Sequence, residues 1–215
     1  MCAIFRDTGV GGGKTYDTHL SWGLLEAARV DPDQRYAGAA LANVRWALRQ
    51  QKENGWFRKC CISDDPSTSL THTIGYALRG VIEAYRYSSD ASFLEGSLRT
   101  ANGLIDAMQD DGFLPGQLNE DWRGTTTWAC LTGTAQIAHC WLLLYRLTGY
   151  PRFRAAGFAA NRYVRRTLRT NGAAETRGGV KGSFPIHGNY NSYQYVSWGN
   201  KFLIDSSLLE LELRD

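Results

Sequence analysis

The stretch VIEAYRYSSDASFLEGSLRTANGLIDAMQDDGFL, residues 81–114, decides the fold because its pattern occurs three times in the chain. Residues 24–57 read LLEAARVDPDQRYAGAALANVRWALRQQKENGWF, and residues 141–174 read WLLLYRLTGYPRFRAAGFAANRYVRRTLRTNGAA. Landmark residues recur 57 positions apart between the first two copies and 60 apart between the second and third. A fixed period of this length indicates a repeat architecture. The landmark pairs are Glu26 and Glu83, Tyr36 and Phe93, Gly55 and Gly112, then Arg86 and Arg146, Phe93 and Phe153, Gly112 and Gly172.

Each copy predicts a helix, a short turn and a second helix. The turns are built from turn formers and N-capping residues. They are Asp31-Pro32-Asp33, Ser88-Ser89-Asp90 and Thr148-Gly149-Tyr150-Pro151. The second helix of each copy begins with an aromatic residue and has a small residue four positions later, which lets helices approach closely. Gly55, Gly112 and Gly172 are expected just past the C-termini of these helices.

These hairpins predict an all-α protein with about seven helices and little sheet, because no segment of comparable length alternates with period 2. Open helical solenoids have repeats of about 34–47 residues with short loops. Here the unit is longer and the extra length lies in one class of loop, which favours part of an (α/α)-toroid. Residues 1–14 are expected to be an irregular lead-in. Residues 15–215 are expected to form three hairpins plus the first helix of a fourth.

The repeat period also bears on what completes the ring. A closed ring of six hairpins would need roughly 350 residues at this period, against 215 in the chain. We therefore expect a partial ring or the C-terminal part of a longer protein. The missing N-terminal part of the toroid or a second copy of the chain would cover its ends. Alone, the chain is expected to dimerise, aggregate or unfold easily.

The composition excludes several classes of function. A net charge of +3 is too small to indicate nucleic-acid binding, and no stretch of 18 apolar residues predicts a membrane span. The five cysteines are odd in number and form no CxxC motif, which predicts free buried thiols in a reducing compartment, the cytoplasm. His139 and Cys140 are adjacent rather than spaced as zinc ligands. We expect no metal site and no cofactor.

The long loops, at about 54–71, 110–133 and 172–197, are predicted to share one end of the molecule. Helix N-termini open onto that end, and their free N–H groups favour an acidic or hydroxyl-rich ligand. Aromatic rings there suit the flat apolar faces of sugars, or else they close the end of the core. The candidate binding residues in these loops are Trp122, Trp128, Tyr190 and Tyr193.

The segment LTHTIGYALR, residues 70–79, places His72, Tyr76 and Arg79 on one helical face. A histidine can give or take a proton near neutral pH, a tyrosine can do so if its pKa shifts, and an arginine can hold a carboxylate. The alternative is a hydrogen-bonded histidine beside a packed tyrosine.

Two further clusters lie on the long loops. Glu120 and Asp121 are candidate acid and base, or binders of sugar hydroxyls, unless they are simply solvated. His187 with a loop tyrosine is an alternative acid–base pair, and Arg123 or Lys181 could neutralise a carboxylate.

Five stretches carry a resemblance to bacterial proteins of the six-hairpin, (α/α)6-toroid class. They are NGWF…CC at 54–61, LTHTIGYALRG at 70–80, DGFLPG at 111–116, CLTGTAQIA at 130–138 and KGSFPI-x-G at 181–188. The resemblance covers nearly all the chain from Thr15 onward. It implies relatives among unsaturated glucuronyl hydrolases, sugar 2-epimerases, the C-terminal domain of glucuronyl C5-epimerases and toroidal polysaccharide lyases.

The resemblance implies a domain that acts on a uronic-acid-containing poly- or oligosaccharide by hydrolysis, β-elimination or epimerisation. The alternatives are a non-catalytic glycan-binding or scaffolding module and a toroidal cyclase on an apolar substrate. We expect one cleft on the long-loop face, with His72 and His187 opening onto a common cavity and Trp128 at its wall. Its other expected lining residues are Tyr76, Trp122, Lys181 and Tyr190.

Overall fold

A computed structural model describes residues 13–31, 34–62 and 67–214. The predicted lead-in therefore lies almost wholly outside the described residues, as do Cys2 and part of the first turn. The helices are η2 (Thr15–Asp17), α1 (Thr18–Val30), α2 (Gln34–Arg49), α3 (Thr71–Ser88), α4 (Ala91–Ala107), α5 (Leu131–Thr148), α6 (Pro151–Arg166) and α7 (Ser197–Glu212). The strands are β1 (Thr68–Leu70), β2 (Gln117–Asn119), β3 (Ala129–Cys130) and β4 (Ser183–Phe184).

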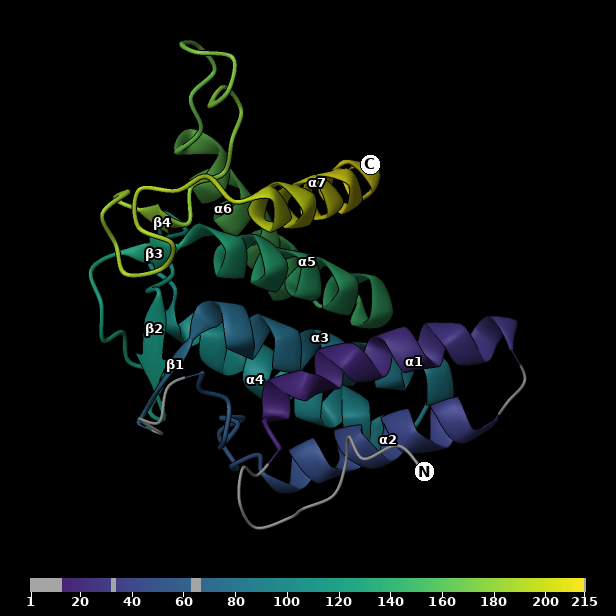
Figure 1. Ribbon diagram of the computed structural model, residues 1–215. Coiled ribbons are helices and arrows are strands. Elements are labelled where there is room, and N and C mark those ends of the chain that lie inside the picture. The colour runs from purple at the N-terminus through teal and green to yellow at the C-terminus, as the bar shows by residue number, and fades with distance from the viewer. Residues whose placement is uncertain (1–12, 32–33, 63–66, 215) are drawn as a thin grey trace.

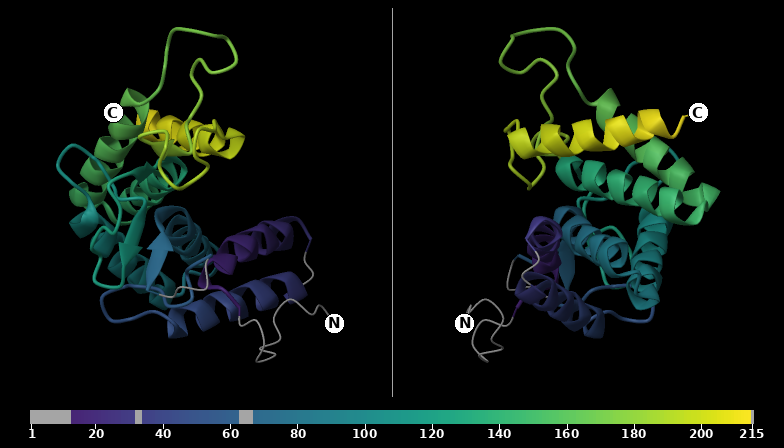
Figure 2. Two further views of the ribbon diagram at one scale, coloured as in Figure 1. Left: turned by 60° about the vertical axis from the view of Figure 1, so that its left-hand side comes forward. Right: turned by 90° about the vertical axis from the view of Figure 1, so that its right-hand side faces the viewer.

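The helices form two layers. α1, α3, α5 and α7 pack side by side in chain order as an inner layer, and α2, α4 and α6 each pack behind the inner helix that precedes them. Figure 1 shows the inner layer facing the viewer, and Figure 2 shows α4 and α6 on the far side of that layer, with α2 below α1. This alternation of inner and outer helices confirms the prediction of an all-α fold that forms part of an (α/α)-toroid.

The short turns form as their residues predict. Ser89 ends α3 in the left-handed conformation, and the Asp90 carboxylate accepts a hydrogen bond from Ser92 N at 3.1 Å at the start of α4. Gly149 ends α5 with φ of +73°, and Pro151 is the first residue of α6. The turns between α3 and α4 and between α5 and α6 lie at one end of the helices and the four strands at the other, as Figure 1 shows.

The aromatic residues that open the outer helices anchor the core in two of the three units. Phe93 and Phe153 are fully buried, and Gly157 lets α6 pack directly against Leu142 of α5. Burying such a ring contributes about 1.5–3 kcal/mol relative to leaving it exposed. Tyr36 is 38% exposed because no outer helix precedes α2 in the described part of the chain.

The three glycines do not stop the helices, so the predicted helix ends were wrong by four or five residues. α2, α4 and α6 end at Arg49, Ala107 and Arg166. Gly55 and Gly112 instead lie in turns, with φ of +88° and +92°. A Cβ at Gly55 would lie 2.4 Å from the backbone of Arg99, and one at Gly112 would lie 2.3 Å from a backbone oxygen in α6. These glycines therefore let each loop pass against the outer helix of the next unit.

Gly172 gives a matched control for this packing because its φ of +100° is similar but nothing lies within 4 Å of its would-be Cβ. We expect Gly172→Ala to lower the free energy of unfolding by about 1–2 kcal/mol, the cost of a left-handed alanine. Gly55→Ala adds a backbone clash and should cost a further ~1–3 kcal/mol. Denaturant titration of both variants measures the difference, and equal losses would contradict the packing role.

Short strand pairs connect the long loops of successive units. β1 pairs with β2, and β3 pairs with β4, both antiparallel. The predicted low sheet content is confirmed, and these pairs hold the loops at fixed positions relative to the inner helices. Cys60, Cys61, Cys130 and Cys140 are free and buried, as expected of them.

At the last inner helix, α7 leaves Ile204, Leu208 and Leu211 more than half exposed, and these three lie at helical spacing. In the described ranges no helix is long and apolar enough to cross a membrane.

Candidate functional site

The N-termini of α3 and α5 meet at the long-loop end of the inner layer. Thr71 N donates to Gly116 O at 3.1 Å, which fixes the first turn of α3 against the loop before β2. A Cβ at Gly133 would lie only 2.5 Å from His72 N, so a glycine is needed for α5 to come this close. The close approach brings His72 opposite Gln136.

His72 is held in one tautomer by this neighbour. Its Nδ1 lies 2.7 Å from Gln136 Oε1, and because an amide oxygen only accepts, Nδ1 carries the proton. Nε2 then keeps its lone pair. Burial lowers the pKa of His72, and the hydrogen bond to Gln136 opposes this only in part. The imidazole is therefore neutral at neutral pH and able to accept a proton.

Rings from α1, α3, α7 and the loop before α7 form a connected group that includes His72. The centroid of His72 lies 4.4 Å from that of Tyr76 and 5.4 Å from that of Tyr190. The ring centroid of Tyr76 also lies 4.1 Å from that of His19 and 6.2 Å from that of Phe202. Trp198 Nε1 donates to the Tyr190 hydroxyl at 3.1 Å. We call these six residues the ring cluster: His19, His72, Tyr76, Tyr190, Trp198 and Phe202.

The tyrosines of the ring cluster are proton donors rather than bases. Burial raises the pKa of Tyr76, and it raises the pKa of Tyr190 to about 12. Both phenols therefore keep their protons at neutral pH. Burial thus lowers the pKa of the imidazole and raises the pKa of the two phenols. Such a separation of pKa values is typical of a base and an acid that act together.

The repeat explains why these residues meet. Tyr76 follows His19 by 57 positions and Gln136 follows Tyr76 by 60, so the three are equivalent positions on successive inner helices. One turn further along, Trp22, Arg79 and His139 are related by the same offsets. His19, Trp22 and Gln136 were not predicted from the sequence, and His139 was considered only as a zinc ligand, although the offsets were the signal that identifies all four.

In the second set of equivalent positions (Trp22, Arg79 and His139), the arginine has a defined orientation. The Arg79 guanidinium lies over the Trp22 ring at 4.0 Å and donates to His139 Nδ1 at 3.3 Å. His139 accepts this bond because burial, reinforced by the charge of Arg79, lowers its pKa to about 3. Burial and Arg79 likewise lower the pKa of His19 to about 4. Both histidines are neutral, so they add no positive charge of their own.

The charges around His139 leave a net excess of one cation. Arg79 Nε donates to Glu83 Oε1 at 2.7 Å, and Arg86 donates to the same carboxylate at 2.9 Å. Lys201 pairs with Asp205 at 2.6 Å. Three cations thus face two carboxylates, and four of these five groups, Arg79, Lys201, Arg86 and Asp205, act on the pKa of His139. This part of the inner face favours an anionic ligand.

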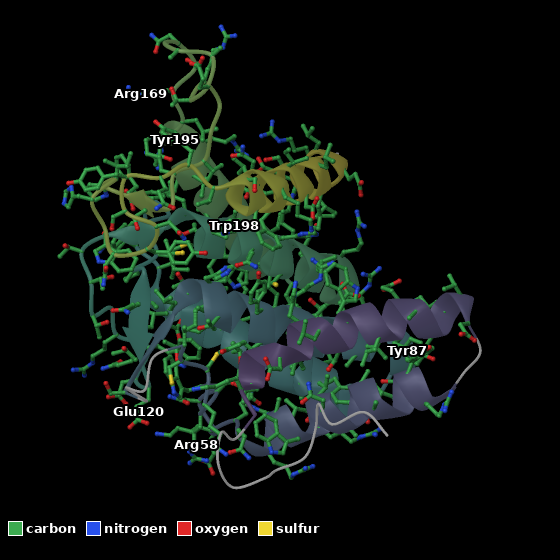
Figure 3. All side chains as sticks on the ribbon, in the orientation of Figure 1. Arg58, Tyr87, Glu120, Arg169, Tyr195 and Trp198 are labelled. Atoms are coloured by element: carbon green, nitrogen blue, oxygen red, sulfur yellow. The ribbon has the colours of Figure 1, made fainter. Side chains whose placement is uncertain are left out.

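Two of the other candidate residues connect neighbouring loops. Trp122 is buried, donates from Nε1 to Asn54 O at 2.9 Å and packs edge-on against Trp56. Glu120 forms an ion pair with Lys52, and this hydrogen bond lowers the pKa of its carboxyl. Figure 3 shows Glu120 at the edge of the molecule, well away from Trp198 of the ring cluster.

The remaining candidates are divided between solvent and core. Asp121, Arg123, His187 and Tyr193 are exposed, Tyr193 by 72%. Lys181 is buried, donates to Thr167 O and lies 5.7 Å from the Tyr195 ring. Trp128 is half-buried and packs against Gly116 and Gly188. The structure thus brings together His72, Tyr76 and Tyr190, with Arg79 on the same helix. Among the described residues, the other candidates form no hydrogen bond, ion pair or ring contact with that group.

Within the ranges that the structure describes, no three side chains of His, Cys, Asp or Glu gather as a metal site would require. The first turns of α3 and α5 offer threonines and His72 but no carboxylate. The chemistry available there is proton transfer by imidazole and phenol, beside the cations of the inner face.

Comparison with known proteins shows the class of fold. No family model matches the chain, and no curated protein sequence matches it. An unsaturated glucuronyl hydrolase from Bacillus sp. GL1 superposes with a TM-score of 0.77 at 18% identity, over 97% of this chain and 61% of that one. A polysaccharide lyase superposes with a TM-score of 0.68 at 10% identity, over 94% of this chain and 62% of that one. A GH76 α-mannanase from Bacteroides thetaiotaomicron superposes with a TM-score of 0.67 at 12% identity, over 94% of this chain and 53% of that one.

These neighbours are (α/α)-toroid proteins named for their action on carbohydrates, and the chain has their fold. It spans about 61% of the length of the first of them. Identities this low show the fold alone, so the chemistry has to be argued from the residues of this chain.

Proposed function

We propose that this chain is a carbohydrate-active domain that abstracts the proton beside the carboxylate of a uronate residue in a glycan, with elimination or epimerisation as the outcome. The observation that carries the proposal is the ring cluster, in which a neutral His72 with a fixed tautomer lies between two protonated tyrosines. The cations around Arg79 lie on the same inner face, about two helical turns beyond His72 along α3.

Each group has a role that its protonation state permits. His72 Nε2 removes the proton at C5 of the uronate, and Arg79 stabilises the carboxylate as negative charge develops on it. In elimination the electron pair forms the C4–C5 double bond, the bond from C4 to the glycosidic oxygen breaks, and Tyr76 or Tyr190 protonates the leaving oxygen. In epimerisation the tyrosine returns a proton to C5 from the opposite face.

Hydrolysis is less well supported by the described residues. A glycosidase of the usual kind needs two carboxyl groups on either side of the scissile bond. Of the loop carboxylates that could act in hydrolysis, Glu120 is committed to Lys52, while Asp111 and Asp121 are exposed on separate loops. Glu83 is committed to two arginines. An unsaturated glucuronyl hydrolase is nevertheless among the structural neighbours. Hydrolysis is therefore the first alternative to elimination or epimerisation. A non-catalytic glycan-binding module is the second.

The polysaccharide lyase among the neighbours supports elimination on this fold. The four free, buried cysteines fit a reducing compartment, and on that ground we propose the cytoplasm as the location of the protein.

One incubation distinguishes these reactions. The protein is mixed in deuterated water with polyuronates, uronate-containing glycosaminoglycans and their unsaturated oligosaccharides. Elimination produces the ultraviolet absorbance of an unsaturated uronate, and epimerisation places deuterium at C5 without cleavage; either result supports the proposal. New reducing ends with neither signal indicate hydrolysis, and binding without any reaction indicates a binding module. Each of these last two results would overturn it.

A further inference from the structure

A separate pocket lies outside the ring cluster, between the loop that follows α4, the helix α6 and the strand β4. Its volume is about 580 Å³, within the range of about 300–1,000 Å³ that small-molecule sites occupy. We propose that this pocket binds a neutral hexopyranosyl residue, free or within a glycan. The lining residues are Ala107, Gln109, Asp111, Phe113, Pro115, Gly124, Thr126, Thr127, Tyr163, Phe184 and Pro185.

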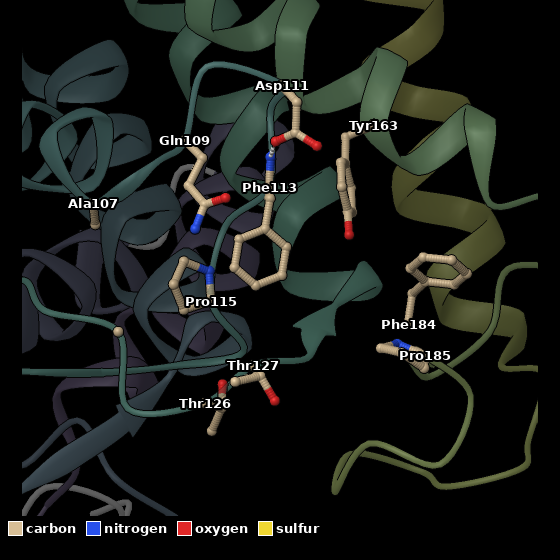
Figure 4. Close-up of a pocket in the computed structure, with 11 residues that line it drawn as sticks. Ala107, Gln109, Asp111, Phe113, Pro115, Thr126, Thr127, Tyr163, Phe184 and Pro185 are labelled. Atoms are coloured by element: carbon tan, nitrogen blue, oxygen red, sulfur yellow. Dashed lines mark hydrogen bonds between the residues drawn. The ribbon is translucent and has the colours of Figure 1, made fainter.

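Three rings from three elements form the apolar part of the pocket. Tyr163 of α6 packs edge-to-face against Phe113 at 5.8 Å and against Phe184 at 6.4 Å. Phe184 remains 39% exposed, so one ring offers its surface to a ligand. Figure 4 shows Phe184 and Pro185 facing Phe113 and Tyr163 across the pocket. Such a surface suits the flat, apolar face of a pyranose ring.

The polar groups of the pocket have unused hydrogen-bonding capacity. Among the described residues, no hydrogen bond engages the side chains of Gln109 and Thr127 or the Tyr163 hydroxyl. Asp111 Oδ1 accepts from Phe113 N at 2.9 Å, which leaves Oδ2 for a ligand. Burial, followed by the charge of Asp111, raises the pKa of Tyr163, so its hydroxyl stays a donor. Donors and acceptors beside exposed rings fit a ligand that has many hydroxyls.

The charge of the lining selects a neutral sugar. Asp111 is the only Asp, Glu, Lys, Arg or His among the lining residues. The nearby Arg166 donates to the backbone carbonyl of Asp111 at 2.6 Å and is not itself part of the lining. A uronate carboxylate in this pocket would therefore face the like charge of Asp111 within the lining, while Arg166 is engaged by a backbone carbonyl outside it, which is unfavourable.

The backbone holds the pocket in shape without a ligand. Gln109 N donates to Phe113 O at 2.9 Å, and Phe184 is paired with Ala129 across β3 and β4. Ser183 Oγ donates to Tyr190 O at 2.8 Å, which closes the loop that supplies Phe184 to the pocket and Tyr190 to the ring cluster. The pocket thus neighbours the proposed reaction site through one loop, but binding there needs no turnover.

The test is a direct titration with glucose, mannose, cellobiose and glucuronic acid, followed by the amide NMR signals of Gly112 and Gly124 and by saturation transfer to the sugar protons. We expect a neutral sugar to shift both amides and glucuronic acid to bind more weakly. Phe184→Ala should weaken the binding of the neutral sugar by about 3- to 10-fold through loss of the ring surface. Asp111→Asn keeps the oxygen that accepts from Phe113 N and should weaken the binding of the neutral sugar by about 10-fold.

Asp111→Asn should also narrow the preference for glucose over glucuronic acid, because the like charge is gone. Tyr150→Ala removes a half-exposed ring at the opposite end of α6 and serves as the control, with no expected change. The proposal is overturned if no neutral sugar shifts these amides, if glucuronic acid binds more tightly, or if the Phe184 and Asp111 variants bind as the parent does. None of these results depends on catalysis, so they do not bear on the reaction proposed above.

Discussion

The variant His72→Gln is expected to turn over a uronate glycan about 100- to 10,000-fold more slowly than the parent, which is the usual contribution of a positioned general base. Glutamine is of similar length, and its amide can still donate to Gln136 Oε1, so the bond at 2.7 Å can be kept. What it lacks is a basic nitrogen in place of Nε2. Binding and thermal stability should therefore stay close to those of the parent, and only kcat should fall.

The pH profile gives this prediction a second readout. Because burial lowers the pKa of His72 below its ordinary value of 6.5, the basic form dominates at neutral pH. The parent's rate should fall only as the pH drops through that lowered pKa. Burial raises the pKa of Tyr76 and Tyr190, so the alkaline loss should begin well above neutral pH. The acid limb should vanish in His72→Gln.

His187→Gln provides the competing variant, because His187 is exposed and was the other histidine in the predicted site. Its kcat should match that of the parent. If His187→Gln loses turnover while His72→Gln keeps it, the base is on the loop and the assignment to α3 is wrong.

The repeat predicted the fold because it depends on local pattern. Helical periodicity and the turn residues defined the hairpins, and the offsets of 57 and 60 related the three copies to one another. The helix ends were misplaced because Gly55 and Gly112 are set by packing against a later helix rather than by their own chain neighbours. Such a contact joins residues more than 40 positions apart, and a local pattern does not record it.

The same distinction separates the candidate residues. His72, Tyr76 and Arg79 share one helical face, and their relation follows from spacing within α3. The loop candidates have no such periodicity. Trp122 turns toward Asn54 and Lys181 toward Thr167 because those partners satisfy buried polar atoms. Comparing equivalent positions across the repeat would have identified His19 and His139 as well.

Replacing Glu83 with alanine is expected to lower the free energy of unfolding by about 3–5 kcal/mol, the usual cost of breaking a buried ion pair by removing one partner. Glu83 is 1% exposed and accepts from Arg79 at 2.7 Å and from Arg86 at 2.9 Å. The side chain of Arg79 is only 12% exposed. Its charge would then be left among Trp22 and a neutral His139, with little water to compensate.

Glu26→Ala is the matched control because Glu26 occupies the equivalent position 57 residues earlier. Its side chain is 51% exposed and pairs with Arg29 at 3.5 Å, so its removal should cost less than about 1 kcal/mol. Denaturant titration compares the two. The double variant with Arg79→Met and Glu83→Leu removes both charges and should recover much of the loss. If it is as unstable as Glu83→Ala, the cost comes from the lost side-chain packing of Glu83 and not from the stranded charge of Arg79, and the orientation of Arg79 toward a bound carboxylate then has no support from this pair.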